Sequence, residues 1–265
     1  MPEPAPPSPA HELSELEALA SVAAVAAADL IRSRLPARDD VATKSTPTDI
    51  VTQTDVDSER LIRDRLIAAT PDAGFVGEEG GTSRGARRLQ WVVDPLDGTV
   101  NFWYRLPVVA VSVAAAVDGV VVAGAVVDVM SGELFSATRG GGSRRDGQTV
   151  TVSHRGDLSQ SLVTTGFSYR AGIRKAQGAV VARILPVVRD IRCFGSAALQ
   201  LCWVGCGRTD AHFERDIKIW DYSAGALVAA EAGADVELPC PENGGLVIAA
   251  TPAVFDSLRR ALDDG

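Results

Sequence analysis

The stretch W-V-V-D-P-L-D-G-T-V-N-F, which runs from Trp91 to Phe102, decides how the rest of the sequence is interpreted. Its apolar start predicts a buried strand that ends at Asp94. Pro95 stops the ladder because it has no amide hydrogen, and Gly98 permits a tight turn. We therefore expect a strand–turn unit whose polar residues gather just beyond the end of the strand.

The turn carries side chains that end in oxygen atoms. Asp94 and Asp97 lie three residues apart on either side of the bend, and Thr99 and Asn101 add a hydroxyl and an amide. Carboxylate, carbonyl and water oxygens are the ligands that Mg²⁺ and Ca²⁺ prefer. An ordinary Asp-Pro turn with one helix-capping aspartate is the competing interpretation, and this loop by itself leaves both open.

Composition limits the classes of function. The chain has 265 residues, enough for one large domain or two small ones, and its 46% hydrophobic content can fill a substantial core. Its net charge of −8 argues against non-specific binding of DNA or RNA, which relies on a basic surface. We expect no direct nucleic-acid partner, whereas a protein partner is not excluded.

The N-terminal segment, residues 1–10, is rich in proline and predicts a disordered tail. It lacks the basic and apolar regions of a signal peptide, and the Ala/Val-rich residues 18–28 are too few to span a bilayer. The cysteines form no C-x-x-C pair, which favours buried, reduced thiols. We expect a soluble, cytoplasmic protein without a membrane partner.

Hydrophobic periodicity predicts an alternation of helices and strands. The expected helices cover residues 13–35, 56–69, 174–188, 196–204, 220–232 and 252–262. The expected strands cover residues 50–52, 75–76, 91–93, 108–117, 120–129, 133–137, 161–165, 191–193, 211–214 and 246–249. The glycines of residues 140–142 are interpreted as a turn at a sheet edge, because a phosphate-binding loop would need a different context. This alternation predicts a layered α/β fold.

Two further acidic sites share the pattern of the central turn. Glu78 follows a predicted strand and precedes a glycine pair, and Asp221 stands at the start of a predicted helix in W-D-Y-S-A-G. Taken singly, Glu78 is typical of a solvated loop acid, and Asp221 of a helix cap. Their combination with Asp94 and Asp97 favours a shared site instead.

That combination resembles the inositol monophosphatase family of Mg²⁺-dependent, Li⁺-sensitive phosphomonoesterases, and its actinobacterial members most. The resemblance extends from Lys44 to about Ala250 and depends on five motifs in order. They are K-S-x-x-x-D-x-V-T-x-x-D (44–55), G-E-E-G (77–80), D-P-L-D-G-T-x-N-F (94–102), G-S-A-A (195–198) and W-D-x-x-A-G (220–225). Each motif is weak alone, but together they form a specific signature.

The resemblance implies the α/β fold of the inositol monophosphatase and fructose-1,6-bisphosphatase type, layered α-β-α-β-α. Residues 11–265 would form a single phosphatase domain. Its N-terminal, metal-binding lobe would cover about residues 11–150, and its C-terminal, substrate-binding lobe about residues 151–265. The family also implies a homodimer.

The resemblance also implies the metal ligands. Glu78, Asp94 and the carbonyl of Leu96 would bind one Mg²⁺, and Asp94, Asp97 and Asp221 a second. A third, looser ion would depend on Glu78 and water. The choice of Glu78 over its neighbour Glu79 follows from the family pattern alone.

Catalytic and substrate-binding roles are implied in the same way. Glu78 and Thr99 would orient the attacking water, with Asp55 holding Thr99 or a nearby water. The substrate would be bound by residues of the turn and of the second half of the chain. These are Asp97, Gly98, Thr99, Gly195, Ser196, Ala197, Ala198 and Glu214, with Ser168 as an addition. One departure stands beside Glu214, because His212 and Phe213 replace residues that are aromatic or tyrosyl in many members.

The function implied is hydrolysis of inositol 1-phosphate, or a related polyol or sugar monophosphate, by direct attack of a metal-activated water. The sequence shows no competing nucleophile motif, such as G-x-S-x-G or a cysteine with a nearby histidine. Two alternatives stay open. The same metal core could serve histidinol phosphate or fructose bisphosphate, or the chain could act in transcription as a non-catalytic interaction protein.

Overall fold

The computed structural model of this chain describes residues 9–35, 41–86, 88–240 and 245–263. Within these ranges the helices are α1 (Pro9–Arg34), α2 (Gln53–Ala69), α3 (Thr99–Tyr104), α4 (Ala171–Ile184), α5 (Ala197–Gly205), α6 (Ile219–Glu231) and α7 (Pro252–Asp263), with 3-10 turns η1 (Leu158–Gln160) and η2 (Leu185–Val187). The strands are β1 (Val41–Thr43), β2 (Ile50–Thr52), β3 (Gly74–Gly77), β4 (Gly81–Ser83), β5 (Leu89–Asp97), β6 (Ala110–Val117), β7 (Val120–Asp128), β8 (Leu134–Thr138), β9 (Gly142–Arg145), β10 (Gln148–Thr149), β11 (Leu162–Thr165), β12 (Asp190–Arg192), β13 (Ala211–Arg215), β14 (Asp235–Glu237) and β15 (Leu246–Ala250).

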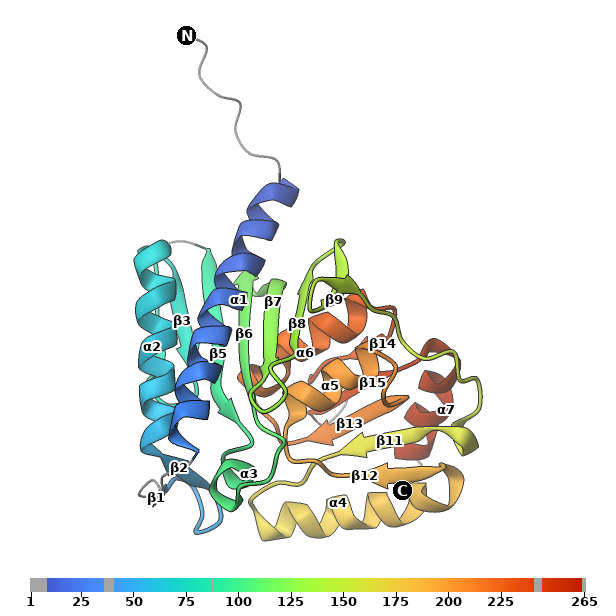
Figure 1. Cartoon of the computed structure of the whole chain (residues 1–265). Helices are drawn as coiled ribbons and strands as arrows, with labels where there is room; N and C mark the ends of the chain where they lie inside the picture. Colours follow the sequence, from blue (N-terminus) through green and yellow to red (C-terminus); the bar gives the residue numbers. More distant parts are fainter. Residues whose placement is uncertain (1–8, 36–40, 87, 241–244, 264–265) are drawn as a thin grey trace.

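The larger of two main sheets has the strand order β10-β9-β8-β7-β6-β5-β3-β4 and is antiparallel except where β3 meets β5. Helices α1 and α2 cover one face, and α6 packs on the other (Figure 1). The central strands β6 and β7 are therefore buried on both faces, as their Val/Ala-rich sequences predict. Buried alanines of α1, from Ala20 to Ala28, let this helix lie close to the sheet.

The smaller sheet has the order β12-β11-β13-β15-β14. Helices α5 and α6 pack together between the two sheets, and α4 and α7 cover the outer face of the smaller one (Figure 1). Helix α7 turns Val254, Leu258 and Leu262 inward, four residues apart on one face. The order of layers is α-β-α-β-α, so the predicted layered fold is confirmed.

The strand that opens the central turn does not end at Asp94, and this prediction is wrong. Strand β5 continues through Pro95 to Asp97, with Asp94 opposite Ser112 and Asp97 opposite Ala110. Three steps on β5 therefore face two on β6, which is a β-bulge. Since Pro95 cannot donate to the ladder, the extra residue is accommodated where the proline stands.

Other boundaries differ for identifiable reasons. The helix predicted over residues 174–188 is α4 followed by η2, because Pro186 cannot make the helical i→i−4 bond. Residues 9 and 10 of the predicted tail belong to α1, and residues 1–8 lie outside the described residues. The short elements β1, β4, β9, β10, β14 and α3 were not predicted, because their sequences carry almost no periodic pattern. The triple glycine does form the turn between β8 and β9.

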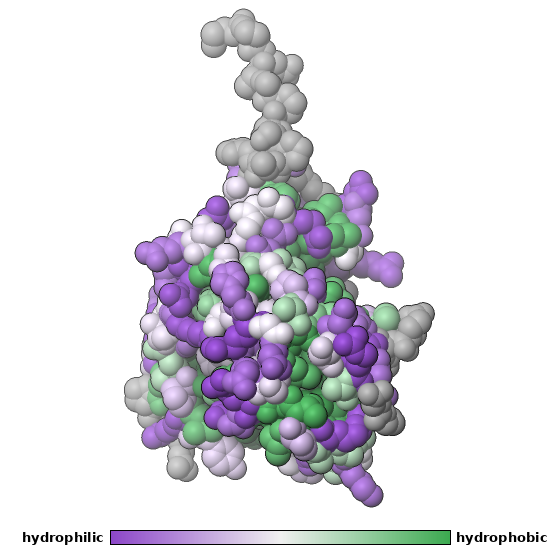
Figure 2. Space-filling model, turned by 90° about the vertical axis from the view of Figure 1, so that its right-hand side faces the viewer, coloured by the Kyte–Doolittle hydropathy of each residue, from purple (hydrophilic) through white to green (hydrophobic). Residues whose placement is uncertain are grey.

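Surface features complete the description. Among the described residues, no helix is long and apolar enough to cross a membrane. On the face seen in Figure 2, hydrophilic residues are interspersed with hydrophobic ones, which gather toward its lower middle. Cys202 is buried as predicted, but the prediction of buried thiols is wrong for Cys193 and Cys240, which are exposed.

The close contact of α5 with α6 depends on Gly225. A Cβ at Gly225 would lie 2.8 Å from the carbonyl oxygen of Ala198 and 2.9 Å from Cβ of Leu201. We predict that Gly225→Ala lowers the free energy of unfolding by about 1–3 kcal/mol, since backbone must move to admit the methyl group.

The matched control is Gly178→Ala in α4, where an added Cβ meets no heavy atom within 4 Å. This variant should be stabilised by about 0.5–1 kcal/mol through helix propensity. Urea unfolding of both variants checks the pair. If Gly225→Ala were as stable as Gly178→Ala, the described packing of α5 on α6 would be wrong.

Candidate active site

A cavity of about 650 Å³ opens where the ends of β3, β5, β11 and β13 meet the starts of α3, α5 and α6. Strands from both sheets therefore contribute to its wall. Its lining includes many acidic side chains and two lysines, Lys44 from the loop after β1 and Lys218 just before α6. This is the place where the motifs of the sequence, far apart along the chain, come together.

The bulge in β5 brings two carboxylates to the cavity. In a regular strand, residues three apart point to opposite faces. Because the bulge adds one residue, Asp94 and Asp97 both line the cavity, and both are nearly buried, with 2% and 8% of their surface exposed. The Asp97 carboxylate accepts hydrogen bonds from Ser196 Oγ at 2.7 Å and from the amide of Ala198 at 2.8 Å. Asp97 thereby anchors the first turn of α5.

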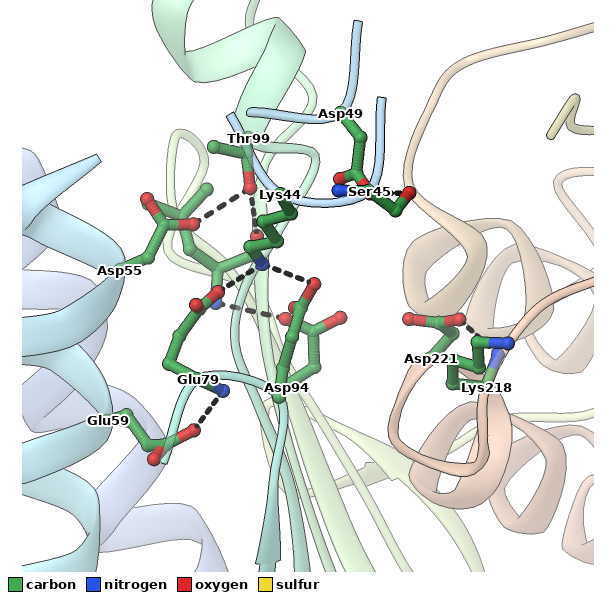
Figure 3. Close-up of polar contacts among 12 residues, drawn as sticks. Lys44, Ser45, Asp49, Asp55, Glu59, Glu79, Asp94, Thr99, Lys218 and Asp221 are labelled. Atoms are coloured by element: carbon green, nitrogen blue, oxygen red, sulfur yellow. Dashed lines mark hydrogen bonds and ion pairs between the residues drawn. The ribbon is translucent and has the colours of Figure 1, made fainter. Parts of the chain in front are cut away.

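A third carboxylate enters from the first turn of α6. Asp221 accepts a hydrogen bond from the amide of Lys218, which fixes its side chain at the helix start. The carbonyl of Trp220 accepts a bond of 3.4 Å from Ser112 Oγ on β6, so the start of α6 is tied to the larger sheet. Figure 3 shows Asp221 on the opposite side of the site from α2, with Asp94 between them.

Thr99 also lines the cavity, and Asp55, which does not line it, contacts Thr99. Thr99 Oγ1 is 2.8 Å from Oδ1 of Asp55 and 3.1 Å from the carbonyl oxygen of Leu96. Asp55 closes a capping box at the start of α2 with Thr52, whose amide and hydroxyl both donate to Oδ2 of Asp55. The hydroxyl of Thr99 is thus held by a carboxylate that is itself fixed by a helix cap.

The loop after β3 carries Glu78 and Glu79, and both accept from the ammonium of Lys44; the bond to Glu78 is 2.8 Å long. Buried Glu59 on α2 accepts from the amides of Glu79 and Gly80 at 2.8 and 2.7 Å (Figure 3). Glu59 therefore shapes the loop that presents Glu78. Sequence reasoning missed Glu59 because its partners are backbone amides, which leave no motif.

The carboxyls of the cavity repel one another. Burial, and then the charge of Glu78, raises the pKa of Asp94 well above its ordinary value and that of Asp221 to about 8. Burial also raises the pKa of Asp97 to about 6, against the hydrogen bonds from α5. Burial alone would lower the pKa of Lys44, but the charges and hydrogen bonds of Glu78 and Glu79 raise it. A cavity with this excess of negative charge attracts cations.

The donor set fits a hard divalent cation. Its members are carboxylate oxygens of Glu78, Asp94, Asp97 and Asp221 and the carbonyl oxygen of Leu96, all of which face the cavity. Among the described residues, no three acidic, cysteine or histidine side chains are close enough to hold an ion as they stand.

The far side of the cavity is less acidic. Glu214 of β13 and Ser168 of the loop after β11 face it, together with the start of α5. Ser168 Oγ donates to Asp216 at 2.6 Å, and Asp216 pairs with Arg170. This network links the loops after β11 and β13.

Most of the predicted site residues come together. The residues that line the cavity are Glu78, Asp94, Leu96, Asp97, Gly98, Thr99, Ser168, Gly195, Ser196, Ala197, Glu214 and Asp221. Asp55 and Ala198 do not line it: Asp55 lies behind Thr99, and Ala198 is buried with its amide on Asp97. Lys44 was quoted only within a motif, and Asp216 was not predicted, although both line the cavity.

The chain is similar to known proteins over most of its length. The model of the inositol monophosphatase family matches residues 12–263. The inositol-1-monophosphatase of Mycobacterium leprae is 50% identical over 236 residues, which cover 84% of this chain and 81% of that protein. The Nus factor SuhB of Xylella fastidiosa is 42% identical over 70% of this chain and 67% of its own length. The crystal structure of the extragenic suppressor protein suhB of Bartonella henselae, 33% identical, superposes with a TM-score of 0.88 and covers 95% of this chain and 99% of that one.

The raised pKa values predict how the stability of the metal-free protein depends on pH. Asp221, with a pKa of about 8, and Glu79, with a pKa of about 7, hold their protons in the folded chain at pH values where the unfolded chain has lost them. The unfolded state therefore binds fewer protons, and the free energy of unfolding falls as pH rises from 6.5 to 8.5. Each proton contributes about 1.4 kcal/mol per pH unit at most.

We predict that the melting temperature of the EDTA-treated protein falls by several degrees as pH rises from 6.5 to 8.5. The melting temperature of the Asp221→Asn variant should fall by less. Asparagine keeps the hydrogen bond from Lys218 but cannot ionise. Buried His212 has a pKa lowered to about 3, so its opposite effect on stability fades at the lower end of the interval, as the unfolded histidine loses its proton. Parallel melting curves for the two proteins would contradict the electrostatic account.

Proposed function

This chain belongs to the inositol monophosphatase family, and on that basis we propose that it is a Mg²⁺-dependent phosphomonoesterase that hydrolyses inositol 1-phosphate or a related polyol or sugar monophosphate. The observation that carries this proposal is the gathering of Asp94, Asp97 and Asp221 with Glu78 around one cavity. Four acids from three separate parts of the chain would repel one another there without a cation. The name of the mycobacterial relative supports the choice of substrate.

Bound Mg²⁺ would supply positive charge that neutralises the phosphate oxygens and acidifies a water molecule. Glu78, Asp94 and the carbonyl of Leu96 would hold one ion, and Asp94, Asp97 and Asp221 a second. A third ion would depend on Glu78. The raised pKa values of Asp94 and Asp221 support these roles, because a cation stabilises the ionised form that burial disfavours.

The protein's own groups would orient the attacking water. When Thr99 Oγ1 donates its proton to Asp55 Oδ1, the lone pairs of Oγ1 are free to accept a hydrogen from water. Glu78, which also lines the cavity, would accept the second hydrogen. Asp55 is buried and does not line the cavity, so we assign it to holding Thr99 in place rather than to contact with the substrate.

The turn between β5 and α3 would hold the phosphate through the amides of Gly98 and Thr99. Gly98 has φ 96° and caps α3, and a Cβ there would lie 2.9 Å from the carbonyl oxygen of Val108. Only glycine fits this conformation without strain. The position therefore keeps its backbone amide accessible to a ligand.

Glu214, Ser168, Asp97 and residues 195–197 would bind the hydroxyl-rich part of the substrate. All of them line the cavity. Ser168 donates its proton to Asp216, so it would act toward the substrate as an acceptor. Acceptors on this side favour a ligand with several hydroxyl groups.

We also propose that the enzyme is a homodimer and that Li⁺ inhibits it, as the family resemblance implies. Large hydrophobic residues at and just after the end of α3 support an interface: Tyr104 is 70% and Leu106 52% exposed. Exposed apolar side chains of this size are typical of contact surfaces.

Loss of one metal ligand should abolish turnover. We predict that Asp94→Asn lowers kcat for inositol 1-phosphate by more than about 100-fold, which exceeds the effect of most substitutions in the outer shell of a metal site. Phosphate release in millimolar Mg²⁺ measures it. Asp118→Asn is the matched control, because Asp118 lies in the β6–β7 turn with φ 52°, which asparagine tolerates, and it should keep full activity.

The same variant separates catalysis from a role in transcription, which the Nus-factor relatives raise as the alternative. A cellular phenotype that survives Asp94→Asn would favour the interaction role. No phosphate release from any polyol or sugar monophosphate by the unchanged enzyme would refute the proposed activity.

The position of Glu214 predicts the ranking of substrates. A carboxyl that faces the cavity beside residues 195–197 can accept from a hydroxyl group, so it should favour inositol 1-phosphate over histidinol phosphate. We expect a higher kcat/KM for inositol 1-phosphate in a screen of phosphate monoesters with and without Mg²⁺. A preference for histidinol phosphate or fructose 1,6-bisphosphate would reverse this assignment.

A further inference from the structure

His212 is a fully buried histidine that the proposed mechanism does not use. It lies two residues before Glu214 on β13, so the two side chains share one face of the strand. Its Nε2 has no hydrogen-bond partner within the described residues and lies 3.6 Å from Oε2 of Glu214. A buried imidazole nitrogen without a partner is costly, which calls for a physical explanation.

The neighbouring strand determines the tautomer of His212. Thr164 stands opposite His212 in the ladder of β11 and β13, and its Oγ1 lies 3.0 Å from Nδ1 of His212 and 3.2 Å from the carbonyl oxygen of Ala211. A carbonyl can only accept, so the hydroxyl proton of Thr164 goes to Ala211. Oγ1 then accepts a hydrogen from Nδ1. The opposite tautomer would leave two acceptors, Oγ1 and the carbonyl, facing each other.

With the hydrogen on Nδ1, a neutral His212 turns a bare lone pair at Nε2 toward Glu214. An ionised Glu214 would place a second acceptor there, and two acceptors at this distance repel. No hydrogen bond to the Glu214 carboxyl is found among the described residues, which leaves His212 as its polar neighbour. A proton on Oε2 removes this repulsion, and a small closure of the 3.6 Å separation would let that proton bond to Nε2.

We propose that His212 is a positioning residue for Glu214, and that the two side chains share one proton as a neutral pair at the substrate end of the cavity. The pair fixes Oε2 against the imidazole and leaves Oε1 to accept a hydrogen from a substrate hydroxyl. The hydrogen bond from a substrate hydroxyl to Oε1 rests on the proposed function, whereas the tautomer of His212 and the shared proton do not.

Packing and charge around Glu214 agree with the pair. A Cβ at Gly166 would lie 2.1 Å from Oε1 of Glu214, so this glycine gives the carboxyl its space. Asp97 and Asp221 face Glu214 from β5 and α6, and the Cys193 thiol lies near it. A neutral pair adds no further negative charge to a cavity that has to admit a phosphate dianion.

The environment favours the neutral forms of both partners. Burial lowers the pKa of His212 to about 3, and burial, with the charges of Asp221 and Asp97, raises the pKa of Glu214 well above its ordinary value. The shared proton therefore resides mainly on the Glu214 carboxyl, which donates to Nε2. Below neutral pH the imidazole stays uncharged.

Nitrogen NMR of the ¹⁵N-histidine-labelled full chain tests the pair directly. The sequence has three histidines, so the signals can be assigned by substitution, and exposed His154 provides a solvent-accessible reference. We expect His212 to carry its hydrogen on Nδ1 between pH 6 and 8, with Nε2 shifted by hydrogen bonding, and Glu214→Ala to remove that shift. A hydrogen on Nε2, or no response to Glu214→Ala, would overturn the proposal.

Two substitutions give a kinetic readout. His212→Phe keeps a ring of similar size but removes the acceptor, and should raise KM for inositol 1-phosphate about 10-fold with a smaller change in kcat. His212→Gln restores an acceptor near the position of Nε2 and should recover most of the loss. An unchanged KM in His212→Phe, or no recovery in His212→Gln, would contradict the positioning role.

The two readouts separate the failure of this proposal from failure of the proposed function. If the NMR result is as expected and no phosphatase activity is found, the pair stands and the function fails. If the enzyme is active and His212 carries its hydrogen on Nε2, the function stands and the pair fails. If a variant does not fold, the NMR measurement on the unsubstituted chain still tests the tautomer of His212.

Discussion

Mutual repulsion of buried carboxylates is the constraint on which this structure depends. Asp94 and Asp97, with 2% and 8% of their surface exposed, lie in one cavity with Asp221 and Glu78. Within the described residues, the only ion pair to any of these four carboxylates is that of Lys44 with Glu78. Burial of like charges destabilises a fold unless their charge is neutralised by protons or cations. The rest of the fold has to hold these groups in place against that repulsion.

Two features of the backbone provide the restraint. The bulge in β5 turns two aspartates toward the same side, and it is held within the larger sheet by pairing on both sides of Pro95. The starts of α5 and α6 bring in the remaining groups, and the helices are locked together by their contact at Gly225. Asp97 links the two parts, because its carboxylate also caps the first turn of α5. The rigidity of the site and the stability of the sandwich therefore share the same contacts.

The sequence predicts the layers and most of the cavity, because both depend on local patterns. Val/Ala runs indicate doubly covered strands, and acids beside glycine or proline mark the ends of elements. What it could not predict depends on distant partners. The bulge arises from pairing of β5 with β6, and the role of Glu59 from amides about 20 residues away. The pairing of Lys44 with two glutamates likewise exists only once β1 and β3 have been brought together.

The two sides of the cavity differ in how freely their residues can vary. In the proposed function the acids of the metal side would be constrained by one chemistry, since each would present oxygen to the same small, hard cation. The side that would face the leaving group needs only complementary hydrogen bonds, and buried His212 lies there beside Glu214. A ring at this position fills the same space beneath Glu214, but only an imidazole offers it an acceptor. Substitution at position 212 can thus change the protonation of Glu214, and with it the choice of substrate, while the metal side of the cavity stays the same.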